Sequence, residues 1–269
     1  VHPPAEVVRM SAEAGLAAVA LADHDNIDGI PAAREAGQQL GVEVISGVEL
    51  SVVWEDFEDI HLLGYGFDPE NPTLRASLAE FQAFREGRNE QVVERVNVKL
   101  AEEGREPLDF GRVRELAGGT VGRPHIAQAL MAKGYVSHTE EAFSRYLVPC
   151  NVPKRFFPAA EAIDLIHAAG GVAVLAHPPY IARDRRLRQK VFDALAALGL
   201  DGIEAWNTGA DNDEVDWTIT QARRRNLIVT GGTDFHGLEG EAILLGGSRG
   251  NLKIPYSCVE EIRERLGRG

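Results

Sequence analysis

Histidine and acidic side chains follow short apolar runs at four places in the sequence. The residues concerned are His24, Glu49, His177, Asp234 and His236. Imidazole and carboxylate ligands without cysteine suit Zn²⁺, Mn²⁺ or Fe²⁺ rather than a thiolate site. A carboxylate can also bridge two metal ions, which two-metal hydrolases hold about 3.5–4 Å apart. These residue types therefore predict a metal centre for hydrolytic chemistry, with Glu49 as a candidate bridge.

His61 and the pair Asp234 and His236 extend this candidate site. His61 opens the apolar run 60–65 instead of following it, which fits a strand of opposite direction or a ligand at the start of a strand. Asp234 and His236 are two positions apart, so on an extended segment their side chains point the same way. A single histidine at a strand end is usually structural. Burying several ionisable groups unpaired would cost several kcal/mol, however, so together they favour a metal site.

Alternating strand-like and helical patterns are expected to position these side chains. Short apolar runs alternate with amphipathic patterns, which predicts an α/β fold with a parallel sheet. The expected strands are 16–22, 42–45, 49–53, 60–65, 172–176, 202–205 and 227–230, and the expected helices are 4–14, 30–40, 124–133, 139–147, 158–169, 187–198, 213–225 and 257–266. Such units close most simply into a distorted (β/α)7-type barrel, with the active site at the carboxyl ends of the strands.

The middle of the chain breaks this alternation. Between residues 74 and 147 the apolar residues recur at helical spacing, and no strand-like run is present. We therefore expect a helical insertion domain at 74–147, within a catalytic barrel domain made of 1–73 and 148–269.

The acidic composition limits the partners of the chain. Among 269 residues, 28 Lys and Arg stand against 41 Asp and Glu, a formal net charge of −13. This charge disfavours a surface that binds long nucleic-acid duplexes, and no apolar run approaches the roughly 20 residues of a membrane-spanning helix. Cys150 and Cys258 form no CxxC pair, so we expect a reducing, cytoplasmic location. If the chain acts on phosphates, bound metal ions must supply the local positive charge.

Other polar residues are expected to be structural. His167 lies on a predicted helix face, and His2 and His138 lie near predicted helix starts. The acidic stretch 55–59 is expected to form a solvated hairpin tip. The stretch 211–214 has the composition of a helix N-cap, where carboxylates favour the helix dipole.

Four motifs resemble, in order and spacing, those of the PHP (polymerase and histidinol phosphatase) family of phosphoesterases. They are Ala22-Asp23-His24-Asp25, Gly47-Val48-Glu49, Ala176-His177-Pro178 and Gly232-Thr233-Asp234-Phe235-His236. The resemblance covers residues 1–70 and about 158–245. Within the family, the chain most resembles the group of nucleoside-3′,5′-bisphosphate phosphatases and 5′→3′ oligoribonucleases. That group also carries a helical insert, and Gly122-Arg123-Pro124-His125-Ile126-Ala127 is similar to its signature.

The resemblance implies up to three divalent ions, of manganese, iron or zinc. Glu49 would bridge the first two ions, with Asp234 on the first, His61 and His177 on the second, and His24 and His236 on the third. The family begins with a strand carrying Asp-Leu-His-x-His, followed by Ser-Asp-Gly, and these residues are absent here. We therefore expect a first strand lost to truncation or disorder, and fewer ions in this chain than in the intact protein.

The resemblance also implies contacts with substrate. Arg123 would bind the substrate phosphate and assist catalysis, and His125 of the same motif is a further substrate-binding candidate. Relatives carry Gly-Lys-Pro near residues 150–155, where this chain differs. Lys154 or Arg155 could bind phosphate in its place, or this segment could be a structural loop.

The expected function is metal-dependent hydrolysis of phosphate from nucleotides or short oligonucleotides. An activated hydroxide would attack phosphorus, and His177 or His236 could protonate the leaving oxygen. The alternatives are a phosphatase for histidinol phosphate or another small phosphomonoester, and a non-catalytic metal-binding remnant. The large insert favours a bulkier substrate than a small monoester. The sequence leaves the oligomeric state open.

Overall fold

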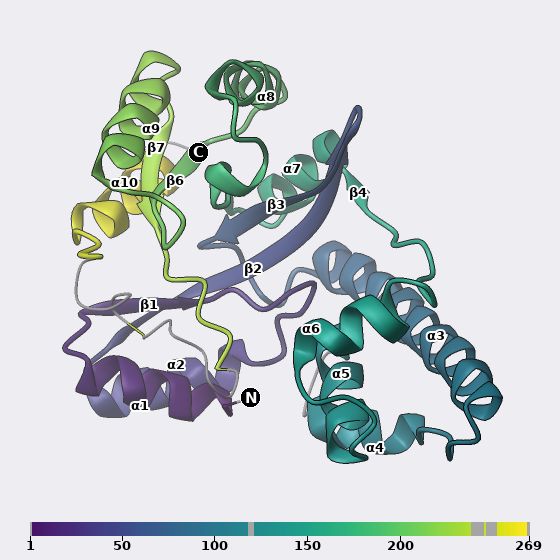
Figure 1. Cartoon of the computed structure of the whole chain (residues 1–269). Coiled ribbons are helices and arrows are strands. Elements are labelled where there is room, and N and C mark those ends of the chain that lie inside the picture. Colours follow the sequence, from purple (N-terminus) through teal and green to yellow (C-terminus); the bar gives the residue numbers. More distant parts are fainter. Residues whose placement is uncertain (1, 118–120, 238–244, 246–251, 268–269) are drawn as a thin grey trace. The chain divides into compact units, whose positions relative to one another are not determined.

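The computed structural model describes residues 2–117, 121–237, 245 and 252–267 of the chain. The chain divides into two compact units. We call Ser77–Arg155 the helical unit, and His2–Ala76 together with Phe156–Gly269 the sheet unit. Figure 1 shows the elements of both units, which are described separately below.

A mixed β-sheet forms the centre of the sheet unit. Its strands are β1 (Ala18–Leu21), β2 (Glu43–Trp54), β3 (Phe57–Tyr65), β4 (Phe157–Pro158), β5 (Val172–Leu175), β6 (Gly202–Trp206) and β7 (Ile228–Gly231). They follow the order β1-β2-β3-β5-β6-β7, with β4 paired to β2, and β1 and β7 end this path in the part of the chain that the structure describes. Only the pairings of β3, with β2 and with β5, are antiparallel among these strands. The α/β fold predicted from the sequence is confirmed, and the opposite direction of the strand that carries His61 is seen directly.

Two expectations about the first strands are wrong. The structure has one continuous strand β2 where two runs, 42–45 and 49–53, were expected. Ser46 and Gly47 lie within this strand, and a Cβ atom at Gly47 would come within 2.4 Å of the Leu21 carbonyl oxygen. A glycine inside a strand often marks such a close backbone approach. β1 is also shorter and more exposed than a strand buried on both faces.

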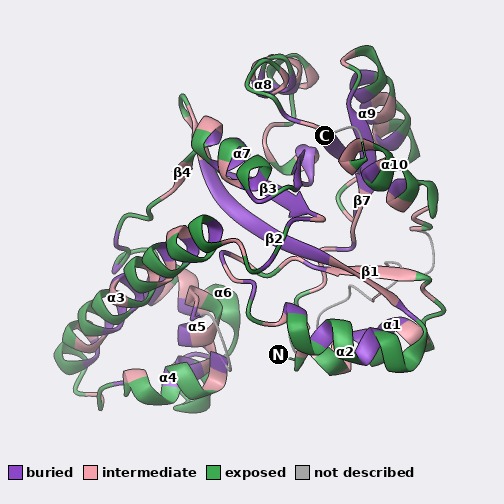
Figure 2. Cartoon of the chain, turned by 180° about the vertical axis from the view of Figure 1, so that it is seen from behind, coloured by how far each residue is buried: buried purple, intermediate pink, exposed green. Residues whose placement is uncertain are grey.

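The described residues of the sheet unit form six α-helices, which have buried inner faces and exposed outer faces (Figure 2). They are α1 (Pro4–Glu13), α2 (Ile30–Leu40), α7 (Ala159–Ala168), α8 (Arg185–Ala197), α9 (Asn212–Arg224) and α10 (Ser257–Leu266), and a short 3₁₀ helix spans Pro178–Tyr180. Their bounds lie within two residues of those expected from the sequence. Local signals explain this agreement. For example, α2 ends at Gly41, whose φ of 72° is the left-handed conformation that glycine adopts at helix ends.

The helical unit packs around its own apolar core. The long helix α3 (Pro72–Glu102) enters it, followed by α4 (Phe110–Ala117), α5 (Arg123–Ala132), α6 (Thr139–Ala142) and a π-helical turn (Phe143–Leu147). Fully buried members of the core include Val96, Leu100, Ile126, Leu130 and Tyr146. The sequence places a helical insertion domain at 74–147, and its independence as a domain stays a prediction. Within the described residues, no helix is long and apolar enough to cross a membrane.

Candidate metal centre

Four of the predicted site residues come from neighbouring strands of the sheet unit. Glu49 lies in the middle of β2 and forms an isolated parallel bridge with His24, which follows β1. His61 lies on the antiparallel partner β3, opposite Ser51. His177 follows β5, and the backbone N–H of the preceding Ala176 donates to the His61 carbonyl oxygen at 3.0 Å. The strand register therefore brings residues far apart in the sequence to one point.

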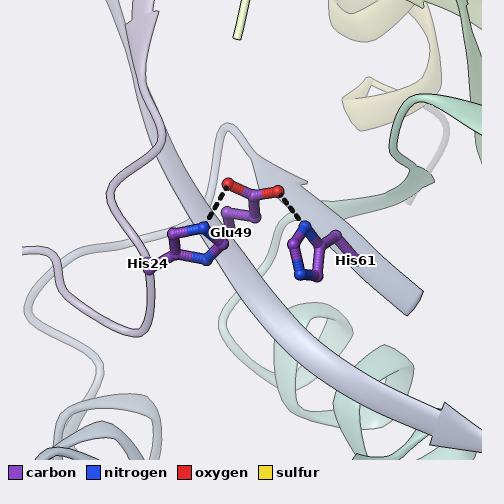
Figure 3. A group of neighbouring side chains, drawn as sticks. All are labelled: His24, Glu49 and His61. Atoms are coloured by element: carbon purple, nitrogen blue, oxygen red, sulfur yellow. Dashed lines mark ion pairs between the residues drawn. The ribbon is translucent and has the colours of Figure 1, made fainter. Parts of the chain in front are cut away.

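The Glu49 carboxylate stands at the centre of this group. One oxygen, Oε1, lies 2.7 Å from His61 Nδ1 and 3.3 Å from His177 Nε2, and these two nitrogens are 3.1 Å apart. The other oxygen, Oε2, lies 3.5 Å from His24 Nε2. Figure 3 shows Glu49 between His24 and His61, with one oxygen directed to each ring. The carboxylate therefore faces two sets of potential ligands, as a bridging ligand must.

The donor atoms of this group fit a divalent cation. Ligands bound to an ion at about 2.1 Å lie roughly 3 Å from one another. The Glu49, His61 and His177 atoms named above have that spacing, and the lone pairs of two imidazole nitrogens this close repel unless a proton or a cation lies between them. Within the described residues, the buried Nδ1 atom of His177 has no hydrogen-bond partner. His24, Glu49 and His61 also form a group of potential metal ligands by the proximity of their donor atoms.

Asp234 and His236 lie on the segment that follows β7. The φ angle of Asp234 is 55°, so this segment is not extended there, contrary to the assumption made from the sequence. The two residues still face each other, with His236 Nδ1 3.7 Å from Asp234 Oδ1 and 2.8 Å from its backbone oxygen. The rings of His236 and His24 have centroids 6.2 Å apart. His236 therefore lies on the His24 side of Glu49, and the charges that act on Asp234 include those of Glu49, His177 and His61.

The buried charges of the centre control each other's protonation. Burial alone would raise the pKa of Glu49, but hydrogen bonds from His177 and His61 and the charge of His24 hold it well below its usual value. Burial would lower the pKa of His61, but the carboxylates of Asp59 and Glu49 raise it to about 9. Without a metal the chain therefore balances the Glu49 charge with imidazolium protons. A divalent cation can replace those protons, because metal binding to histidine releases them.

Two acidic residues near the centre are absent from the set predicted by the sequence. Glu204 on β6 is only 4% exposed, and its Oε2 accepts the backbone N–H of His177 at 2.8 Å. A carboxylate inside a short buried strand is unusual, and that was the available signal. Asp59, expected only in a solvated hairpin tip, has an oxygen 3.7 Å from His61 Nε2. Asp59 reaches the His61 ring only because β2 and β3 pair, and the amino-acid composition of this stretch does not reveal that pairing.

The predicted substrate-binding residues Arg123, His125 and Lys154 lie in the helical unit. Arg123 begins α5 and its guanidinium lies 5.4 Å from the centre of the Phe143 ring. His125 Nδ1 accepts the backbone N–H of Gly122 at 3.0 Å, which caps the same helix. Burial lowers the pKa of His125, so its neutral form is favoured for that acceptor role. Lys154 is exposed.

Several expectations of structural roles are confirmed. His138 caps α6 by accepting the Glu141 backbone N–H, and His167 lies 2.7 Å from Asp201. Asp211 caps α9 through the Glu214 backbone N–H at 2.9 Å, as the acidic stretch predicted. The polar side chains of His138, His167 and Asp211 therefore make structural contacts. Within the described residues, the group of potential metal ligands is the one around Glu49.

Comparison with known proteins agrees with this geometry. The PHP domain family matches residues 1–147. The chain is 35% identical over 240 residues to a 5′-3′ exoribonuclease of Haemophilus influenzae, covering 87% of this chain and 84% of the relative. It is 31% identical over 237 residues to a 3′,5′-nucleoside bisphosphate phosphatase of Chromobacterium violaceum, covering 87% and 81%.

A solved structure extends the comparison to three dimensions. A protein of Bifidobacterium adolescentis, described as a candidate metal-dependent phosphoesterase, has a TM-score of 0.82 and 32% identity, covering 98% of this chain and 91% of that one. Sequence and fold thus agree over nearly the whole chain. The chain belongs to the PHP domain family and is a metal-dependent phosphoesterase.

Proposed function

We propose that the chain hydrolyses phosphate esters of nucleotides or short oligonucleotides. The observation that carries this proposal is the convergence of Glu49, His61 and His177 donor atoms within 3.3 Å of one another, with His24 on the second Glu49 oxygen. The proposed substrates follow those named for the relatives, a 5′-3′ exoribonuclease and a nucleoside bisphosphate phosphatase. Both would present a phosphate near the 5′ or 3′ end of a short chain.

Six residues are proposed to hold up to three divalent ions. They are His24, Glu49, His61, His177, Asp234 and His236. The ions supply Lewis acidity, which generates a water-derived nucleophile at neutral pH and offsets charge on phosphate oxygens. Manganese, iron and zinc all suit this set of ligands, so metal availability selects among them.

The chain's own residues have distinct tasks in this proposal. The Glu49 carboxylate would link two parts of the centre. Its Oε1 faces His61 and His177, and its Oε2 faces His24. His177 is buried and its Nε2 is directed to Glu49. His236 is half exposed, and it is the better placed of the two histidines to pass a proton to a departing oxygen. We assign that role to His236 in the state where its Nε2 holds no ion, because its Nδ1 already lies 2.8 Å from the Asp234 backbone oxygen.

The helical unit is proposed to serve the same reaction. Arg123 would offset phosphate charge, and His125 and Lys154 would contribute to substrate binding, as the family resemblance implies. An insertion domain at 74–147 would then select a substrate larger than a simple phosphomonoester. The partner is proposed to be a small phosphorylated molecule in the cytoplasm, rather than a long duplex.

A substrate panel tests this proposal. The full chain, loaded in turn with Mn²⁺, Fe²⁺ or Zn²⁺, is incubated with adenosine 3′,5′-bisphosphate, a 5′-phosphorylated trinucleotide RNA and histidinol phosphate. Release of inorganic phosphate from the first, or of mononucleotides from the second, is expected. Preference for histidinol phosphate would favour the small-monoester alternative, and inactivity on the nucleotide substrates with every metal would contradict the proposal.

Glu49→Gln and Glu55→Gln form a matched pair for this assay. Losing an outer partner of a metal ligand already costs about 10–100-fold, so losing the bridging carboxylate is expected to lower kcat/KM by at least about 100-fold. Glu55 lies on the exposed turn between the same two strands, β2 and β3. Its variant is expected to keep wild-type activity. Equal activity of both variants would contradict the role of Glu49.

A further inference from the structure

Glu204 is a buried carboxylate at the edge of the metal centre. It lies on β6, between the apolar residues Ile203 and Ala205, and is 4% exposed. One oxygen, Oε2, accepts the backbone N–H of His177 at 2.8 Å. A carboxylate so deeply buried is rare in proteins unless it has a specific partner. Here the partner is the backbone of a residue whose ring faces Glu49.

His177 has an unusual backbone conformation at this point. Its φ is 25° and its ψ is 62°, a left-handed conformation that non-glycine residues rarely adopt. The chain leaves β5 here and turns into the short helix Pro178–Tyr180. Strained conformations of this kind persist only where surrounding contacts hold them. The Glu204 carboxylate supplies one such contact at the residue itself.

Gly232 makes room for the same carboxylate. A Cβ atom at position 232 would lie 2.6 Å from Glu204 Oε1, which is closer than side chains approach one another. Gly232 begins the segment that carries Asp234 and His236. The Glu204 carboxylate is therefore held between two segments that both bear potential metal ligands, with one oxygen toward each.

We infer that Glu204 is a positioning residue for His177, an inference that rests on the metal binding of the proposed function. Its carboxylate holds the His177 backbone in the left-handed turn. This turn directs His177 Nε2 to within 3.1 Å of His61 Nδ1 and 3.3 Å of Glu49 Oε1. Glu204 thereby sets the affinity of this half of the centre for a divalent cation, without itself being a ligand.

Asp201, directly before β6, provides a control variant near the same two strands. Its Oδ2 accepts the backbone N–H of Ala173 at 2.9 Å, at the opposite end of the β5–β6 pair. Like Glu204, Asp201 is a carboxylate that accepts a backbone N–H. Its partner Ala173 lies at the start of β5, whereas His177 follows the end of that strand. Asp201 also contacts His167 and Arg265, so removing it reports the effect on stability of losing carboxylate contacts away from His177.

The test compares Glu204→Ala, Glu204→Gln and Asp201→Ala in the full chain. Binding of Mn²⁺ to metal-free protein is measured by calorimetry, and thermal unfolding by circular dichroism confirms that each variant is folded. Glu204→Ala is expected to weaken Mn²⁺ binding about 10–100-fold, the usual effect of losing a partner that orients a metal ligand. Glutamine retains an acceptor oxygen, so Glu204→Gln is expected to bind like the wild type. Asp201→Ala is expected to unfold at lower temperature with unchanged Mn²⁺ affinity.

Crystal structures of the metal-free variants give a second readout that does not depend on metal binding or catalysis. The His177 ring is expected to move away from Glu49 and His61 in Glu204→Ala, and to stay in place in Glu204→Gln. Wild-type Mn²⁺ affinity in Glu204→Ala, an unmoved ring, or an equal loss of affinity in Asp201→Ala would overturn the inference. A displaced ring in a protein that hydrolyses no nucleotide would instead refute the proposed function and leave the role of Glu204 intact.

Discussion

Replacing Glu204 by glutamine is expected to change how the stability of the metal-free chain depends on pH. Burial raises the pKa of Glu204 from 4.5 to about 8 in the folded chain. Between these two values the folded chain keeps a proton on Glu204 that the unfolded chain releases. The contribution of this group to stability is therefore complete below pH 4.5 and is lost as the pH rises through about 8.

The size of the effect follows from the difference between those two pKa values. Each pH unit between them changes the free energy of unfolding by about 1.4 kcal/mol. From pH 5.5 to pH 7.5 the wild type should therefore lose on the order of 3 kcal/mol through this group. Glutamine does not titrate, so the Glu204→Gln variant lacks this loss. The variant should gain stability relative to the wild type as the pH rises.

Urea unfolding in the presence of a chelator measures this difference. All three tryptophans, Trp54, Trp206 and Trp217, lie in the sheet unit, so their fluorescence follows the unit that contains Glu204. The pKa values of His61 and His177 are also raised, against the effect of burial, by neighbouring carboxylates. Glu204 is one of the carboxylates that raise the pKa of His177, so the difference between the two curves reports Glu204 together with its coupling to His177.

A constant difference between the two proteins from pH 5.5 to pH 7.5 would refute this reasoning. It would mean that Glu204 is ionised in the folded chain, and that burial does not control its protonation. Glu55→Gln, on the exposed hairpin turn, serves as the control and should show no such difference from the wild type.

Three further predictions concern other parts of the molecule. Tyr180, 65% exposed beside the His177 ring, offers a face for a nucleobase, so Tyr180→Ala should raise KM for a nucleotide about tenfold while Tyr180→Phe should not. Arg88 is buried and donates to the Val152 carbonyl oxygen at 2.8 Å, so Arg88→Met should lower the free energy of unfolding by about 1–3 kcal/mol, measured by far-ultraviolet circular dichroism. Burial raises the pKa of Cys258 to about 12 and that of Cys150 in the same direction, so a thiol reagent at pH 8 should modify both cysteines only in denaturant.

Much of the fold can be predicted from local patterns. The helix at Ile30–Leu40 has its bounds marked by a proline in its first turn and by Gly41 after its end. Strand β5 is a continuous apolar run, as expected of a strand buried on both faces. These features depend on residues that are adjacent in the sequence, so they can be predicted from the sequence alone.

The remaining features depend on contacts between distant segments. Gly47 lies inside β2, where the strand passes so close to Leu21 that a Cβ atom would not fit, and this close approach is not visible in the local sequence. Glu204 reaches the metal centre through the backbone of His177, which lies 27 positions away. The convergence of the candidate ligands could be predicted, because strand ends share one face. The acidic residues that support those ligands could not, because side chains at one sheet edge meet only once the register is known.

The antiparallel pairing of β3 and β5 has a consequence for how this chain can change over evolution. Tyr65 at the end of β3 pairs with Val172 at the start of β5, and the long segment between them touches the sheet again at the short strand β4, which pairs with β2. Closing such an excursion costs conformational entropy that grows only logarithmically with its length, by about 0.6 kcal/mol for each doubling. Segments of very different size could therefore be exchanged there with little thermodynamic penalty. His61 and His177, at the far end of the same strand pair, would stay in register while the segment proposed to select the substrate is rebuilt.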